Sequence, residues 1–226
     1  GTNGKTSVTH LMEGMLHGLG VVTGLSSTAE RHIAGEVIPS RLTTPEASEM
    51  HALLALMRER HVGAILVEVS AQALTRHRVD GLHFDVAGFT NLSHDHLDDY
   101  ADMAEYLAAK AALFTPERSR RAVVCVDQPA GIAVAGGAGI PVTTILTPAI
   151  AEDPETESDW RVDIVAENPD GTTFTLSGPV GQLTTTVPVI GPHMASNAGL
   201  AIVMLLEAGW DWTALADLVG GRRIEA

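Results

Sequence analysis

"GTNGKTSVTHLMEGMLHGLG", residues 1–20, joins a glycine-rich turn to a helix, and this junction decides the fold class. Apolar residues recur every three or four positions, which predicts an amphipathic helix from Gly4 to Gly20. These residues are Val8, Leu11, Met12, Met15, Leu16 and Leu19. The backbone N–H groups of such a turn and the positive end of the helix dipole attract an anion. The stretch therefore predicts a phosphate-binding loop, and the alternative is an ordinary glycine turn.

Two side chains in the turn match this chemistry. Lys5 would place a point charge on the β- and γ-phosphates of a nucleotide, and the hydroxyl of Thr6 can bind Mg²⁺. Loops of this kind normally follow a buried strand, and no residues for such a strand precede Gly1 in the sequence. We therefore expect a sheet that lacks a central ladder beside the loop.

Length and composition indicate a globular protein of one large domain or slightly more. The chain has 226 residues, 45% of them hydrophobic, and no apolar run reaches the roughly 18 residues that a membrane helix needs. The net charge of -14 argues against nucleic-acid binding, although local donors could still hold a small anion. A single cysteine, Cys125, excludes an internal disulfide framework, and we expect a cytoplasmic protein with no membrane partner.

Apolar runs of strand length alternate with helical segments between residues 20 and 127. The runs are residues 20–27, 63–70, 84–92 and 121–127, the helical segments are 47–61 and 99–114, and residues 31–46 predict a hairpin. Runs that are apolar throughout are typical of strands buried on both faces of a parallel sheet. The predicted fold class is therefore α/β, with a doubly wound, mostly parallel sheet of the P-loop type.

The composition and the residue pattern of the sequence change after Val126. Residues 131–148 are rich in glycine and proline, and the acidic residues 151–159 predict a solvated loop. Residues 160–189 alternate around an Asn-Pro-Asp-Gly turn, which predicts antiparallel hairpins. Two helical segments, 194–209 and 211–221, close the chain. We therefore expect a small antiparallel β addition near the C-terminal part.

Four longer blocks carry a family resemblance. They are "EVSAQALTRHRVDG" (68–81), "FDVAGFTNLSHDHLDDY" (84–100), "MAEYLAAKAALF" (103–114) and "GPHMASNAGLA" (191–201). In wording and order they resemble the central domain of the Mur ligases, the ATP-dependent enzymes that build the peptide stem of bacterial peptidoglycan. The likeness covers the whole chain, residues 1–226, and is greatest to the MurE type, which adds the third residue to a UDP-N-acetylmuramoyl-dipeptide.

The resemblance implies a site for ATP and Mg²⁺. It assigns the triphosphate to the loop and the adenine to Asn197, with Thr6, Glu68 and His96 as Mg²⁺ ligands. The loop residues are Gly1, Thr2, Asn3, Gly4, Lys5, Thr6 and Ser7. A carboxylate at the end of a buried strand is costly unless it is paired or binds a metal, so the alternative for Glu68 is a structural ion pair.

The block around His96 also admits a zinc site with His94, but no further soft ligand lies nearby in the sequence. Asp95 and Asp98 are expected to organise the turn and the start of the next helix instead.

Lys110 lies in a predicted helix, where the simplest interpretation is a solvated lysine. The resemblance implies that Lys110 reacts with CO₂ to form a carbamate. Burial would favour this reaction because it lowers the pKa of the amine, and the carbamate oxygens suit Mg²⁺. By resemblance, Lys5, Glu68, His96 and Lys110 form the catalytic set.

The resemblance assigns the UDP-sugar peptide to Thr43, Thr44, Ser70, Arg76 and Arg78. An arginine suits a two-pronged hold on a carboxylate or phosphate, whereas the alternatives are a turn cap for the threonines and a surface ion pair for the arginine. The chain departs from the family pattern at Ala71, Gln72, Arg76 and Met194, where the family usually has Ser, His, Gln and Asn. These departures leave the substrate assignment less specific than the ATP assignment.

The implied function is ATP-dependent amide-bond formation on a UDP-MurNAc-dipeptide through an acyl phosphate, with an amino acid as the second substrate. Mur ligases have a UDP-binding domain before this domain and an amino-acid-binding domain after it. We therefore expect the chain to be a central-domain fragment that does not ligate alone and that acts with those domains. The alternatives are another Mur-like or folylpolyglutamate-type ligase, and a non-catalytic nucleotide-binding module.

Overall fold

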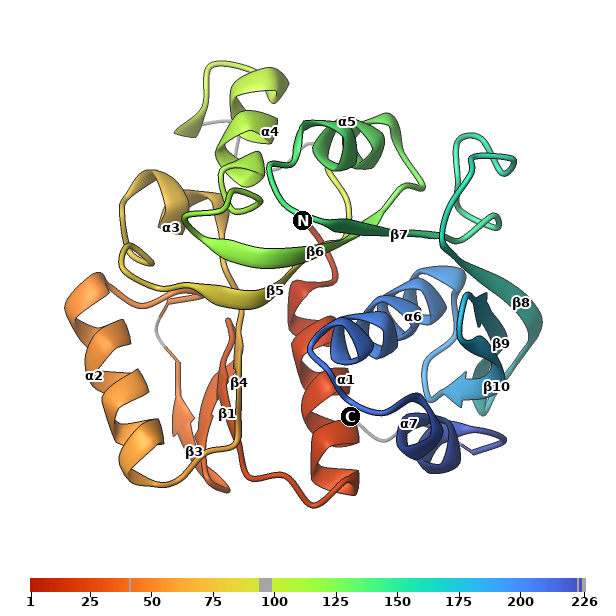
Figure 1. Ribbon diagram of the computed structural model, residues 1–226, viewed down its shortest axis with the longest axis horizontal. Coiled ribbons are helices and arrows are strands. Elements are labelled where there is room, and N and C mark those ends of the chain that lie inside the picture. Colours follow the sequence, from red (N-terminus) through yellow and green to blue (C-terminus); the bar gives the residue numbers. More distant parts are fainter. Residues whose placement is uncertain (41, 94–98, 223, 225–226) are drawn as a thin grey trace.

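In this computed structural model, the strands of the described residues, which are 1–40, 42–93, 99–222 and 224, form two sheets (Figure 1). The first sheet has the order β3-β2-β1-β4, and β1 (Thr23–Ser26) pairs in parallel with β4 (Ala64–Val67). Beside β1, β2 (Glu30–Ile33) and β3 (Glu36–Pro39) form the predicted hairpin. Its turn, residues 34–35, has the two positive φ angles, 51° and 87°, that match the twist of a hairpin.

The second sheet holds the other parallel strands and the antiparallel addition, in the order β10-β9-β8-β7-β6-β5. The strands are β5 (Phe84–Phe89), β6 (Ser119–Cys125), β7 (Val142–Leu146), β8 (Trp160–Asn168), β9 (Gly171–Gly178) and β10 (Gly181–Val187). Strands β5 to β8 pair in parallel, and β8, β9 and β10 pair antiparallel. The prediction of an α/β fold with a mostly parallel sheet and an antiparallel addition is therefore confirmed.

Helices cover both faces of the second sheet (Figure 1). On one face lie α1 (Lys5–Gly18) and α6 (Pro192–Glu207), and on the other lie α4 (Met103–Ala111) and α5 (Pro129–Gly137). The remaining helices are α2 (Ala47–Glu59), α3 (Ala71–Thr75) and α7 (Trp212–Val219). Each helix that the structure describes is too short or too polar to span a lipid bilayer.

Strand β6 shows why the parallel strands are apolar throughout. Val123 and Cys125 belong to the core under α1 and α6, whereas Ala122 and Val124 belong to the core under α5. Because successive side chains of a strand point to opposite faces, a strand that serves two cores needs apolar residues at every position.

The sequence analysis assigned no element to residues 131–148, where the structure has most of α5 and all of β7. The glycines obscured α5, because glycine weakens a helix. Gly131 is there for close packing, since a Cβ at this position would lie 1.9 Å from the carbonyl oxygen of Cys125. The acidic residues 151–159 carry no helix or strand, as predicted.

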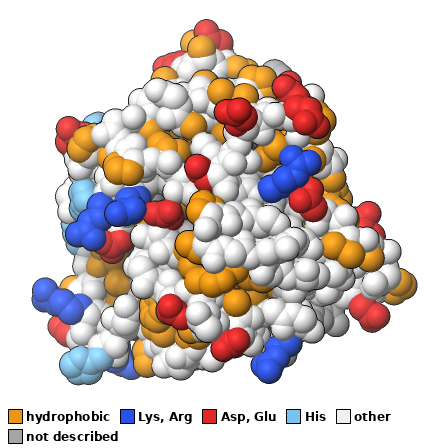
Figure 2. Space-filling view, turned by 45° about the vertical axis from the view of Figure 1, so that its right-hand side comes forward, with side chains coloured by type: hydrophobic (Ala, Val, Ile, Leu, Met, Phe, Trp, Pro, Cys, Tyr) orange, Lys and Arg blue, Asp and Glu red, His pale blue; other side chains and the backbone are white. Residues whose placement is uncertain are grey.

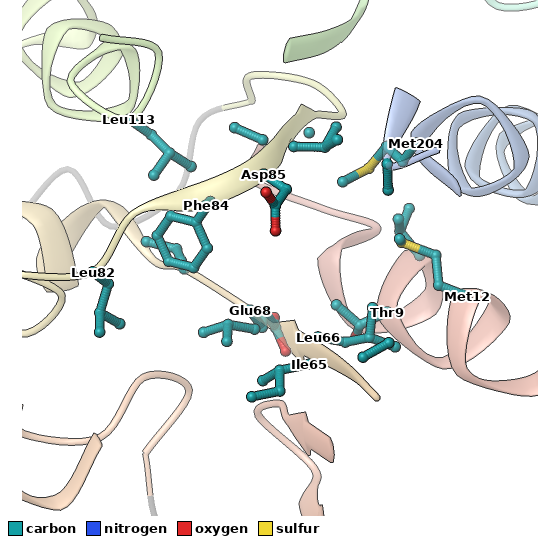
Figure 3. A pocket seen from close by; sticks show the side chains of 18 of the residues that line it. Thr9, Met12, Ile65, Leu66, Glu68, Leu82, Phe84, Asp85, Leu113 and Met204 are labelled. Carbon is teal, nitrogen blue, oxygen red and sulfur yellow. The ribbon is translucent and has the colours of Figure 1, made fainter. Parts of the chain in front are cut away.

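A gap separates the two sheets between β4 and β5. Among the described strands, β4 pairs only with β1 and β5 only with β6, so each has one edge without a strand neighbour. A cavity of 1180 Å³ lies between these edges. Figure 3 shows Met12, Leu66, Phe84 and Met204 around it, from α1, β4, β5 and α6.

An extended apolar segment joined to Gly1 is expected to enter this gap and add a strand, because Gly1 lines the same cavity. The added strand would bury Leu66 and Phe84 and would pair the open edges of β4 and β5. A seven-residue extension rich in valine and isoleucine should raise the melting temperature by roughly 5 °C. For a domain of this size, this shift corresponds to a gain of about 2 kcal/mol in the free energy of unfolding. Amide exchange in β4 and β5 should also slow.

The control is an extension of equal length with two prolines, which cannot donate ladder hydrogen bonds. Equal melting temperatures and equal exchange rates for the two extended chains would contradict the prediction.

Candidate active site

The turn before α1 has the backbone geometry of an anion-binding loop. Gly4 adopts φ 84°, in the left-handed region that favours glycine, and α1 begins at the next residue, Lys5. The side chain of Asn197, on α6, lies directly over this turn, because a Cβ on Gly4 would come 2.4 Å from Asn197 Oδ1. Asn197 Nδ2 also contacts the Sδ atom of Met194 at 3.8 Å. The predicted adenine-binding residue therefore lies against the loop itself.

The loop is fixed in place by the segment that follows β5. The backbone N–H of Thr2 donates to the carbonyl oxygen of Asn91 at 2.8 Å, and that of Asn3 donates to Asn91 Oδ1 at 2.9 Å. Thr90 Oγ1 donates in return to the carbonyl oxygen of Asn3 at 2.6 Å. These hydrogen bonds set the position of the loop relative to the carboxyl end of β5.

Lys5 folds back across the loop. Its Nζ donates to the carbonyl oxygens of Gly1 at 3.1 Å and Thr2 at 2.7 Å. The ammonium is therefore held over the turn by neutral acceptors, which a phosphate could replace as a stronger partner. Ser7 stands in the first turn of α1, whose N–H groups point toward the loop.

Glu68 follows β4 and is only 3% exposed. Thr6 Oγ1, in the first turn of α1, donates to the carboxylate and lies 3.1 Å from each of its oxygens. Thr28, two residues beyond the end of β1, donates its backbone N–H to Oε2 at 2.8 Å and its hydroxyl to Oε1 at 3.1 Å. Hydrogen bonds from Thr6 and Thr28 thus reach both oxygens of the buried carboxylate.

Lys110 is 5% exposed, and its Nζ lies 4.1 Å from the centre of the Tyr106 ring. The simple interpretation of a solvated lysine is therefore wrong. Lys110 lines the same cavity as Gly1, Lys5 and Glu68, where β4 and β5 end. Burial, followed by the charges of Lys110 and Lys5, holds the pKa of the Gly1 α-amino group well below its ordinary value. The structure thus brings Lys5, Glu68 and Lys110 together, whereas His96, with His94, Asp95 and Asp98, lies outside the described residues.

The predicted substrate residues lie beside Glu68. Thr44 is fully buried, and its Oγ1 donates to the Glu68 carbonyl oxygen at 2.8 Å and accepts from the Ser70 N–H at 3.2 Å. Arg78 donates to the carbonyl oxygen of Thr44 at 3.4 Å and pairs with Glu46 at 2.7 Å. Thr43 Oγ1 lies 3.0 Å from Thr28 Oγ1. In this state of the protein, Thr44 and Arg78 therefore have structural partners.

Two departures from the family pattern share one partner. Gln72 Nε2 and Arg76 Nη2 both donate to the carboxylate of Asp99, the latter at 3.4 Å. The Arg76 side chain is 56% exposed, so it lies at the rim and not in the buried part of the site.

The residues present fit a magnesium ion. Mg²⁺ typically takes one or two protein oxygens and completes its shell with phosphate and water. Thr6 and Glu68 supply a hydroxyl and a carboxylate of this kind beside the phosphate-binding loop. The described residues do not form a metal site from protein groups alone, since they contain no cluster of three or more His, Cys, Asp or Glu side chains suited to a metal.

Charge near the site is local. Figure 2 shows Lys and Arg side chains in small, separate groups among Asp and Glu on the face viewed, without a broad basic patch. The loop and Lys5 can therefore attract a phosphate while that face as a whole does not suit a nucleic-acid backbone.

Asp127, which the sequence analysis did not select, is buried after β6. It accepts hydrogen bonds from the Thr147 N–H at 2.6 Å and from Ser196 Oγ at 3.4 Å. Burial raises the pKa of Asp127 to about 6, although both hydrogen bonds act in the opposite direction. Because Ser196 precedes Asn197 on α6, this carboxyl lies next to the candidate site. Burial and Asp127 also raise the pKa of the Cys125 thiol far above its usual range.

Sequence reasoning missed Thr28, Thr90, Asn91 and Asp127, and they share one signal. Each stands one or two residues beyond the end of a parallel strand, β1, β5 or β6. The carboxyl ends of parallel strands line one edge of a sheet, where ligands bind in open α/β folds. Polar residues at these positions could have been selected on that rule.

Comparison with known proteins gives the family context. Residues 1–205 match the family described as Mur ligase middle domain. The UDP-N-acetylmuramyl-tripeptide synthetase of Leifsonia xyli is 57% identical over 216 residues, which are 95% of this chain and 41% of that protein. The UDP-N-acetylmuramoyl-L-alanyl-D-glutamate--2,6-diaminopimelate ligase of Streptomyces avermitilis is 44% identical over 220 residues, 96% of this chain and 42% of that protein. The chain thus spans about two fifths of the length of these relatives.

Solved structures show the same fold. A UDP-N-acetylmuramoyl-L-alanyl-D-glutamate--2,6-diaminopimelate ligase superposes with a TM-score of 0.80 at 24% identity, over 97% of this chain and 44% of that one. FolC of E. coli, in complex with DHPP and ADP, superposes with a TM-score of 0.64 at 20% identity, over 98% of this chain and 55% of that one.

Asp127→Asn is expected to stabilise the protein at pH 7.5. The folded-state pKa of about 6 lies above the ordinary value of 3.8, so the folded state loses stability as the pH rises through this window. Asparagine does not ionise, and it keeps an oxygen for the Thr147 N–H. Denaturant unfolding should show a gain of up to about 3 kcal/mol at pH 7.5 that vanishes near pH 4.

Asp163→Asn is the control, because Asp163 is half exposed on β8. A gain for Asp127→Asn that does not change with pH, or a loss at pH 7.5, would contradict the prediction.

Proposed function

The chain belongs to the Mur ligase family as its middle domain, and from this premise we propose that it binds ATP and activates a carboxylate for amide-bond formation. The observation that supports this proposal is the convergence of Lys5, Thr6, Glu68 and Lys110 beside an anion-binding loop. A cation, a hydroxyl and a buried carboxylate around a phosphate site are the groups that phosphoryl transfer needs.

In the proposed reaction, the γ-phosphoryl group of ATP passes to the carboxylate of a UDP-N-acetylmuramoyl-dipeptide, which gives an acyl phosphate and ADP. The amino group of an incoming amino acid then attacks the acyl carbon, and an amide and inorganic phosphate result. The product carries the third residue of the stem peptide of peptidoglycan. The names of the relatives, a tripeptide synthetase and diaminopimelate ligases, support this choice of substrate.

Each nucleotide-binding residue has a role that its position permits. The backbone N–H groups of residues 1–7 hold the phosphates, and Lys5 exchanges its carbonyl partners for the β- and γ-phosphates. Asn197, which lies over Gly4, directs the adenine. Thr6, Glu68 and His96 would hold Mg²⁺, which would neutralise charge on the transferred phosphoryl group.

Lys110 is proposed to carry a carbamate. Its amino group is buried and lines the same cavity as Lys5, and burial disfavours the charged form and so favours the neutral amine that reacts with CO₂. The modification would replace a cation with an anion and so provide a further oxygen ligand for Mg²⁺.

The substrate is proposed to approach along Thr43, Thr44, Ser70 and Arg78, with Arg76 at the rim. Because Arg78 pairs with Glu46 and Arg76 with Asp99, a substrate carboxylate or phosphate would compete with these pairs for the guanidinium groups. The UDP-binding and amino-acid-binding domains of the longer protein would supply the remaining contacts.

A folylpolyglutamate-type ligase is the second candidate, because FolC shares the fold. A nucleotide-binding module without turnover is the third, although the buried and hydrogen-bonded Glu68 favours a working site.

Full-length protein is expected to release phosphate only when ATP, Mg²⁺, a UDP-N-acetylmuramoyl-L-alanyl-D-glutamate substrate and an amino acid are all present. Lys5→Ala should lower kcat by roughly 10²–10³-fold, the cost of removing one charge-stabilising donor. Arg161→Ala is the matched control, since Arg161 pairs with Asp163 on β8 outside the site. Release with a folate and glutamate instead would identify the second candidate, and nucleotide binding without any release would favour the third.

Lys110 carbamylation is expected to be visible without turnover. Protein equilibrated with ¹³C-bicarbonate at pH 8 should give a carbamate carbonyl signal in ¹³C spectra, and acidification should remove it. Lys110→Arg should lack the signal, because a guanidinium stays charged. A spectrum identical for wild type and Lys110→Arg would contradict the assignment.

A further inference from the structure

Thr28 is the main hydrogen-bond donor to the Glu68 carboxylate. It supplies two of the donors, the backbone N–H to Oε2 and the hydroxyl to Oε1. The parallel register of β1 and β4 aligns Ser26 with Val67, which places the residues that follow these two strands side by side. Thr28 thus reaches Glu68 because of the sheet, although the two residues are 40 positions apart in the chain.

The geometry separates the role of Thr28 from that of Thr6. Thr6 Oγ1 lies 3.1 Å from both carboxylate oxygens, so this hydroxyl does not distinguish one from the other. Thr28 gives a separate donor to each oxygen, and a pair of donors of this kind fixes the plane of the carboxylate. Glu68 therefore depends on Thr28 for its orientation.

Thr28 also reaches the substrate side of the site. Its Oγ1 lies 3.0 Å from Thr43 Oγ1. The Thr28 hydroxyl is the donor in this contact as well, and because a hydroxyl has one proton, Thr43 Oγ1 and Glu68 Oε1 share it as acceptors. The Thr28 hydroxyl therefore stands between Thr43 and Glu68 in one chain of contacts.

A second connection makes this chain rigid. Thr44, the neighbour of Thr43, donates to the carbonyl oxygen of Glu68 at 2.8 Å. The segment after the β2–β3 hairpin is thus tied to Glu68 through both its side chain and its main chain. A movement of Thr43 on substrate binding would be transmitted to the carboxylate.

We propose that Thr28 is a positioning residue that orients Glu68 toward the nucleotide-bound cation and links this carboxylate to the substrate threonine, Thr43. This inference rests on the proposed function, because it takes Glu68 as a cation ligand. Thr28 would act through Glu68 and is therefore a positioning residue rather than a catalytic one.

The test uses full-length protein and three variants. Thr28→Val keeps the shape and the backbone N–H but removes the hydroxyl, and Thr28→Ser keeps the hydroxyl. Thr185→Val is the matched control. Thr185 lies on β10, outside the site, is 1% exposed, and donates its hydroxyl to the carbonyl oxygen of Arg222. If Thr28→Val does not fold, Thr28→Ala removes the same hydroxyl.

The first measurement is the Mg²⁺ concentration needed for half-maximal binding of a fluorescent ATP analogue, without turnover. Thr28→Val should raise it roughly tenfold, the factor for one hydrogen bond to a charged group. Thr28→Ser and Thr185→Val should stay within about twofold of wild type. The melting temperature without ligand should fall equally for Thr28→Val and Thr185→Val, since each loses one buried hydroxyl.

The second measurement is a double-mutant cycle with Thr43→Val on the same Mg²⁺ midpoint. Thr43→Val alone should lower the midpoint, because it leaves the Thr28 proton to Glu68 alone, and it should change nothing in the Thr28→Val background, where the link is already broken. Additive effects would overturn the link to Thr43.

A midpoint for Thr28→Val equal to that of Thr185→Val would overturn the positioning role and leave the proposed function intact. Wild-type protein that binds no Mg²⁺–nucleotide would instead overturn the proposed function, and the inference with it.

Discussion

The buried carboxylate of Glu68 is the constraint on which the site depends. An unpaired carboxylate in this position would be prohibitively costly, so donors from separate segments must meet it. The structure provides them from the first turn of α1 and from the residue that follows β1 by two positions. The same requirement fixes the start of α1 relative to β4, and thereby places the loop and Lys5. The glycine turn before α1 is thus positioned by a side chain far from it in the sequence.

The rest of the site follows from the parallel strands. The polar groups stand just beyond the carboxyl ends of four strands: Thr28 after β1, Glu68 after β4, Asn91 after β5 and Asp127 after β6. Each is held by a hydrogen bond to a neighbouring segment, so these strand ends are fixed in both sheets. The gap between β4 and β5 opens directly under this edge, and its end is formed by Gly1, Lys5, Glu68 and Lys110. The candidate site residues therefore lie where the parallel strands end and where the gap between β4 and β5 opens.

Much of the fold could be predicted because periodicity and apolar runs are local signals. The helix after the loop and the antiparallel strands at 160–189 formed near their predicted bounds, whereas the hairpin predicted for residues 31–46 formed but its second strand ends earlier, at Pro39. The prediction failed for residues 131–148 because glycines obscure a helix, and Gly131 serves packing against β6, a tertiary contact that composition does not show. In the site, Lys5, Glu68 and Lys110 were found through motifs and resemblance, whereas Thr28 was not. Its role arises from the register of β1 against β4, which no local pattern encodes.

Two of the departures from the family pattern, Gln72 and Arg76, are linked to each other. Gln72 and Arg76 stand four residues apart, on one side of α3, and both donate to Asp99. A guanidinium where the family usually has a neutral glutamine would add a positive charge at the rim, and Asp99 balances it. An exposed pair of this kind contributes little to stability, so its effect is on local charge and on the position of side chains. Asp99 therefore couples the two positions, and a change at either Gln72 or Arg76 alters the charge that the rim at α3 presents.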